Sequence, residues 1–228
     1  MKKIVTILAV ILCMPLICTM FIKPDKESWK KPENDTSVIN EKFLVLVKEG
    51  TGNFTYKPEE LTALMMYFLI PDTILFSSSE DYIAEGSGAA HDPEQEYLKA
   101  LAIVCRTDIA YIWEKEGCPD RLDFDKMGLP LSNFSSIYID VAIASDNQTK
   151  MNEIKNAVET TMGAVITKEN NVIAAPFFTT SDADMLVGEA GDGTGISLNY
   201  AYELAAQGMD FYEILKYFFA EIKIVMYE

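Results

Sequence analysis

The residue types of this chain restrict the kinds of metal site that it could form. His91 is the single histidine among 228 residues, which excludes a His-rich metal site and any mechanism that needs two imidazoles. Clustered carboxylates could still hold Ca²⁺, because hard cations prefer oxygen ligands. One such group lies in a glycine-containing stretch, without the spacing of an EF-hand loop: Asp182, Asp184, Glu189 and Asp192. We therefore expect no metal and no cofactor, with a calcium site in this stretch as the alternative.

The charge balance excludes several classes of partner. The chain has 19 Lys and Arg against 35 Asp and Glu, a formal charge of −16. A nucleic-acid-binding protein needs basic surface to displace counterions from phosphate, and docking on anionic lipid needs it too. With 49% hydrophobic residues, wholesale disorder is also excluded. The sequence predicts a globular protein that binds no nucleic acid.

The N-terminal segment resembles a membrane anchor. Residues 4–22 are apolar and uncharged behind Lys2 and Lys3, and about 20 apolar residues span a bilayer as a helix. The lysines favour a cytoplasmic position for residues 1–3. We expect a single-pass anchor over 4–22, a polar tether over 23–40 and an extracytoplasmic domain over 41–228. A cleaved signal peptide is the alternative, although residues 17–21 lack the small residues of a cleavage site.

Helical and strand patterns are interleaved from residue 41 onward without regular βαβ spacing. This order predicts an α+β domain, with a mixed or antiparallel sheet and packed helices. Cys105 falls on an apolar helical stretch and is expected in the core, and its pairing with Cys118 is left open. The expected helices are 59–69, 94–116, 151–162, 196–207 and 211–219. The expected strands are 43–47, 136–144, 164–166, 172–175 and 222–227, with a turn at 168–171.

Several segments resemble motifs of one bacterial family. Residues 96–107, EYLKALAIVCRT, resemble the EALKAQAVAART helix of the stage II sporulation protein D/LytB family. Residues 157–166, AVETTMGAVI, are similar to its AVxxTxGxVI segment, and 173–181, IAAPFFTTS, to its IxAxYxSTS segment. Three further segments are similar to GMSQxGA, MAxxG and YxEILxYYY of the family: 195–201, 204–208 and 212–218.

The resemblance implies a specific function. Sporulation members of the family are anchored by one N-terminal helix and act on peptidoglycan during engulfment of the forespore. They cleave glycan strands already stripped of peptides, by chemistry that resembles lytic transglycosylation. One carboxylic acid protonates the glycosidic oxygen, and the muramic acid 6-hydroxyl closes a 1,6-anhydro ring. Such an acid needs a raised pKa, which an apolar pocket supplies.

The departures from the family pattern fall where the chemistry is expected. The catalytic glutamate of the family motif EYLxGVVAxEMP aligns with Leu69 when the motif is placed on residues 60–71, and leucine cannot donate a proton. Two family glutamines are Leu101 and Leu198, and a family histidine is Asp192. The combined losses indicate a site with weak or lost activity. A relocated acid would come from one of three glutamates: Glu60, Glu80 or Glu85.

The remaining polar residues of the motifs are candidates for glycan binding. Lys99 and Arg106 could hold sugar hydroxyls or a lactyl carboxylate, although pairing with neighbouring acids is an equal alternative. The hydroxyls after residue 178 could line a sugar groove or serve ordinary turn chemistry. The candidate binding residues are Lys99, Arg106, Thr107, Thr179, Thr180, Ser181, Asp192 and Ser197.

Three functions follow from the sequence. We expect an extracytoplasmic protein that binds peptidoglycan glycan strands, or a partner in a wall-hydrolase or engulfment complex. The first alternative is an active lytic transglycosylase with a relocated acid. The second is an enhancer of wall amidases, as LytB-like members are described.

Overall fold

The computed structural model describes residues 29, 44–49, 52–70, 92–123, 147–178 and 195–227. Contacts divide the chain into two units, Met1–Lys30 and Lys31–Glu228. Apart from Trp29, every described residue belongs to the second unit, and the fold below is that of this unit.

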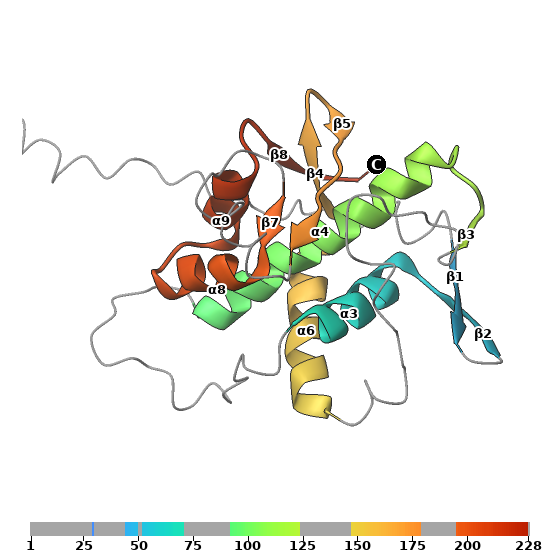
Figure 1. The fold of residues 1–228 in the computed structure, drawn as a ribbon, viewed down its shortest axis with the longest axis horizontal. Helices are drawn as coiled ribbons and strands as arrows, with labels where there is room; N and C mark the ends of the chain where they lie inside the picture. The colour runs from blue at the N-terminus through green and yellow to red at the C-terminus, as the bar shows by residue number, and fades with distance from the viewer. Residues whose placement is uncertain are drawn as a thin grey trace, which may run out of the picture. The chain divides into compact units, whose positions relative to one another are not determined.

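Helix α4 (Pro93–Lys115) runs through the centre of the described fold (Figure 1). Asp92 caps its N-terminus by accepting a hydrogen bond from the Glu94 amide, and Pro93 occupies the first turn, where its missing N–H costs nothing. All side chains from Leu101 to Ala110 are buried. A helix that is covered on all sides must be surrounded by other elements.

Four helices and a strand surround α4. They are α3 (Pro58–Leu69), α6 (Gln148–Thr160), α8 (Leu198–Ala206), α9 (Phe211–Phe218) and β4 (Ala164–Lys168). Helix α9 begins with a reciprocal capping box between Asp210 and Glu213, a strong local signal for a helix start. The sequence predicted all five helices within about three residues of their ends.

Within the described ranges, the strands form three small sheets. In the first, β1 (Leu44–Glu49) pairs antiparallel with β2 (Gly52–Tyr56) and parallel with β3 (Arg121–Asp123). In the second, β4 lies between β5 (Asn171–Val172) and β8 (Lys223–Met226), antiparallel to both. In the third, β6 (Phe177–Phe178) pairs parallel with β7 (Ile196–Ser197).

The turn between β4 and β5 confirms a sequence prediction. Glu169 and Asn170 both have positive φ, +53° and +65°. Two successive residues with positive φ match the right-handed twist of a tight hairpin. The expected turn at 168–171 therefore closes the β4–β5 pair.

Two of the fold expectations need correction. The α+β class is confirmed. The described strands form three small sheets where one sheet was expected. The sequence analysis did not predict β2, β3, β6 or β7. The expected membrane helix is not part of the described fold: no described helix is long and apolar enough to cross a bilayer. Residues 4–22 and the expected strand 136–144 lie outside the described residues.

Candidate functional site

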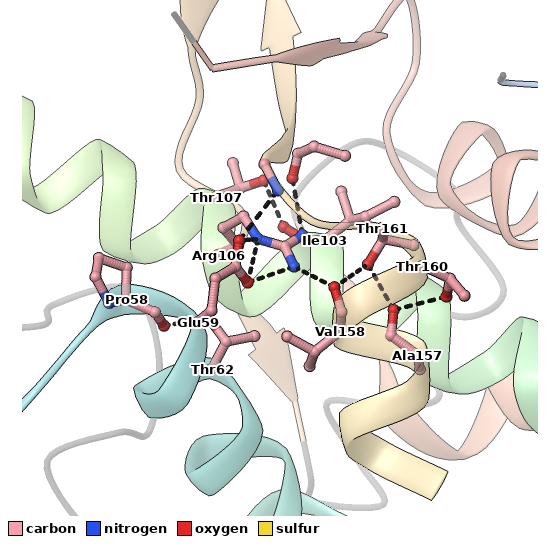
Figure 2. A network of polar contacts seen from close by, with 12 residues as sticks. Pro58, Glu59, Thr62, Ile103, Arg106, Thr107, Ala157, Val158, Thr160 and Thr161 are labelled. Atoms are coloured by element: carbon pink, nitrogen blue, oxygen red, sulfur yellow. Dashed lines mark hydrogen bonds and ion pairs between the residues drawn. The ribbon is translucent and has the colours of Figure 1, made fainter. Parts of the chain in front are cut away.

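The most buried charged pair of the described domain joins α3 to α4. Arg106 has 0% of its surface exposed and Glu59 has 8%. The Arg106 Nε lies 2.8 Å from both carboxylate oxygens of Glu59, and one terminal nitrogen lies 2.6 Å from Oε2. Figure 2 shows this fork between α3 and α4. Such a pair is stable only when further hydrogen bonds satisfy both ions.

Backbone groups supply those further hydrogen bonds. Arg106 Nη1 donates to the carbonyl of Ala164, and Nη2, which also contacts Glu59, donates to the carbonyl of Val158, both at 3.1 Å. The Gly163 amide donates to Glu59 Oε1 at 3.0 Å. The ion pair thus fixes α3, α4 and the connection from α6 to β4 in one arrangement. Arg106 cannot contact a ligand from this position, and it would influence binding only through the elements it holds.

A cleft of about 770 Å³ lies beside this ion pair. Its walls come from β2 and α3 on one side and from α6 on the other. Clefts of 300–1,000 Å³ are the usual size of small-ligand sites. The apolar lining includes Ala63, Leu64, Met151 and Val158, and the polar lining includes Tyr56, Glu59, Glu60, Gln148, Lys155 and Glu159.

The charged side chains that line the cleft differ in burial and in their partners. Glu59 is neutralised by Arg106 behind the wall. Glu60, the one described candidate acid, is exposed and its Oε2 accepts a hydrogen bond from the Lys57 amide at 2.9 Å, as in a capping box. Lys155 and Glu159 are exposed on α6. The cleft therefore has an apolar floor and a rim with both signs of charge.

Three more of the predicted binding residues lie apart from the cleft lining. Thr107 is fully buried, where its hydroxyl donates to the Ile103 carbonyl and accepts from the Ile166 amide at 2.9 Å. Ser197 is fully buried and caps α8 by accepting from the Tyr200 amide. The partly exposed Lys99 pairs with Glu96 on its own helix at 2.7 Å.

The position aligned with the family's acid is apolar and buried. Leu69, the last residue of α3, has 5% of its surface exposed. Next to it, the buried Lys150 donates from Nζ to the Ile70 carbonyl at 2.9 Å. The two leucines at the family's glutamine positions, Leu101 and Leu198, are each 1% exposed.

Two carboxyl groups that the sequence analysis did not single out have raised pKa values. Burial raises the pKa of Asp108 to about 7; its Oδ1 accepts from the Ala175 amide, and its Oδ2 has no partner among the described residues. Burial and the nearby charges of Asp92 and Glu153 raise the pKa of Glu94 to about 7. Sequence alone offered no signal for either group, because their burial arises from the packing of distant segments.

The other candidate residues lie outside the described part of the chain. In the described ranges, no group of three His, Cys, Asp or Glu side chains could hold a metal ion. Cys105 is buried as predicted, Cys118 is exposed, and both are free thiols. The candidates outside the described residues are Glu80, Glu85, Thr179, Thr180, Ser181 and Asp192, together with the possible calcium ligands.

The comparisons with known proteins give no family. Neither the protein-family models nor the curated proteins contain a match to this sequence. The resemblance of the motifs and the geometry of the site are therefore the grounds for a function.

Proposed function

We propose that this chain is a divergent relative of stage II sporulation protein D that binds peptidoglycan glycan strands with weak or lost lytic transglycosylase activity. Its place would be extracytoplasmic, in sporulation-related wall remodelling. The observation that carries the proposal is Leu69, an apolar, buried residue at the position of the family's acid. A glycosidic oxygen is a poor leaving group without a proton donor, so this loss would stop the reaction and leave binding intact.

The arrangement of the motif segments supports the proposal. The α4 motif lies at the centre of the fold, and the segments of the other motifs pack around it as β4, α8 and α9 (Figure 1). Arg106 of the α4 motif reaches the backbone of Val158 and Ala164, which belong to the 157–166 motif. Segments that resemble separate motifs of the family thus form one packed unit.

The second candidate function is that of an active lytic transglycosylase with a relocated acid. Among the described residues, Glu60 is the candidate for that acid. Its carboxylate is exposed at the cleft, whose lining also includes the exposed Glu159 of α6. A general acid needs access to the glycosidic oxygen, and this position supplies access. An apolar pocket of the kind that tunes an acid is not formed around it.

Co-sedimentation tests the proposal. The purified chain is mixed with intact, insoluble peptidoglycan, and with microcrystalline cellulose as the control polysaccharide. We expect the protein to sediment with the glycan and not with cellulose. A chain that stays in the supernatant with both polymers would contradict the proposed function.

A further inference from the structure

The cleft between α3 and α6 has the chemistry of a saccharide site. Its floor is formed by Ala63, Leu64 and Met151, which offer apolar contact to the C–H face of a sugar ring. Its rim carries Glu60 and Glu159, whose carboxylates accept hydrogen bonds from hydroxyl groups. A few placed polar groups over an apolar surface are typical of small-ligand sites.

The same lining disfavours other ligands. Nucleotides and phosphates need several cations or a helix N-terminus aimed at the anion. This cleft offers one exposed cation, Lys155, beside two exposed carboxylates. An acyl chain would need a closed apolar cavity, and charged groups line this one. The hydroxyls of a sugar can donate to Glu60 and Glu159, and a carboxylate on the same sugar can pair with the Lys155 ammonium.

The cleft is also a preorganised site. Glu59 belongs to its lining and at the same time anchors α3 to Arg106 of α4. The Gly163 amide bonds to Glu59. Arg106 donates to the Val158 carbonyl (Figure 2), so the same ion pair holds the C-terminal end of α6. Both walls are therefore tied to α4, and a ligand binds without first ordering them.

We propose that this cleft is the glycan-binding site of the protein, with Lys155 selecting sugars that carry a carboxylate, such as the lactyl group of muramic acid. The inference rests on the proposed function and adds where on the surface the glycan binds. It places the ligand beside the first half of α3, at Glu60, Ala63 and Leu64. Leu69, at the other end of that helix, is not part of the lining.

Calorimetric titration of the full chain tests the site with two probes. One is soluble glycan strands stripped of peptide, and the other is chitotetraose, a neutral oligosaccharide of N-acetylglucosamine. The double variant Glu60→Gln/Glu159→Gln should weaken binding of both probes about tenfold, since hydrogen bonds to charged groups are lost. Glutamine at position 60 can still accept from the Lys57 amide, so the helix cap is kept.

Lys155→Gln should weaken binding of the glycan strands roughly twofold to fivefold, because one exposed ion pair is lost, and leave chitotetraose unchanged. The matched controls are Glu203→Gln on α8 and Lys223→Gln on β8, both exposed and outside the cleft lining. Glycan binding that all cleft variants retain would overturn the site and leave the proposed function standing. If the unmodified chain binds neither probe, the proposed function fails and the site with it.

Discussion

The Arg106 guanidinium and the Glu59 carboxylate form a buried fork with contacts of 2.6 to 2.8 Å. The two residues are 47 positions apart in the sequence. Their pairing joins α4, which carries the 96–107 motif, to α3, one of the two helices that line the cleft. This relationship makes Arg106 a positioning residue, in agreement with pairing to an acid, one of the two roles that the sequence left open.

We expect Glu59→Gln to destabilise the fold by about 3–5 kcal/mol, because it leaves the Arg106 charge buried without its counter-ion. Urea unfolding followed by circular dichroism measures the change. The control is Lys168→Gln, since Lys168 pairs with Glu221 at 3.3 Å with both side chains well exposed. That control should cost less than about 1 kcal/mol. Equal effects of the two variants would refute the assigned role of the buried pair.

We expect the stability to depend on pH through Asp108. Its pKa is raised from 3.8 to about 7 in the fold, so the folded state binds a proton that the unfolded state has released. The free energy of unfolding should therefore fall as the pH rises from about 4 through 7, by up to about 4 kcal/mol from this group.

Asp108→Asn tests this pH dependence, since the amide oxygen can still accept from the Ala175 N–H and carries no charge. The free energy of unfolding, measured in urea, should differ less between pH 5 and pH 8 for the variant than for the unmodified chain. Asp120→Asn, at an exposed position, is the control. A difference that stays the same in Asp108→Asn would exclude Asp108 as its source.

We expect Gly195→Ala to disturb the β6–β7 pair. An added Cβ would lie 2.6 Å from the Pro176 carbonyl oxygen and 2.6 Å from a ring carbon of Phe178. Because one of these atoms is backbone, the strands must separate, at a cost of about 1–3 kcal/mol. Thermal unfolding measures the loss. An unchanged melting temperature would show that the two segments do not approach this closely.

We expect glycan binding to strengthen as salt is added. Peptidoglycan is anionic and the chain has a net charge of −16, so the long-range interaction is repulsive and salt screens it. The contact between Lys155 and a carboxylate is a single ion pair and does not reverse this balance. Titration at low and at physiological salt tests the sign, and binding that weakens steeply with salt would contradict it.

The helices could be predicted from the sequence because their signals are local. Pro93 and Gly117 bracket α4, and Asp210 with Glu213 marks the start of α9. The strands β6 and β7 could not be predicted, since each is two residues long and forms only by pairing across the chain. Ser197 illustrates the difference: its motif suggested glycan contact, and in the fold it caps α8.

The site was predictable only in part, for a related reason. Glu60 was one of the three glutamates that the sequence offered as a relocated acid, and it lines the cleft. Lys155 and Glu159 lie on the polar side of α6 and have no distinguishing spacing. Only the packing of α6 against α3 brings them into one cleft with Glu60. The ionisation of Asp108 depends in the same way on its burial against the segment around Ala175.

The central claim is that the chain holds glycan and does not cleave it. The most direct test is mass spectrometry of peptide-stripped glycan strands after incubation with the unmodified chain, with Leu69→Glu and Leu69→Gln tested in parallel. The account predicts no 1,6-anhydro ends from the unmodified chain, under conditions in which the same strands bind the protein. The appearance of 1,6-anhydro ends with the unmodified chain would contradict it, and Glu60→Gln would then show whether the acid has moved to the cleft.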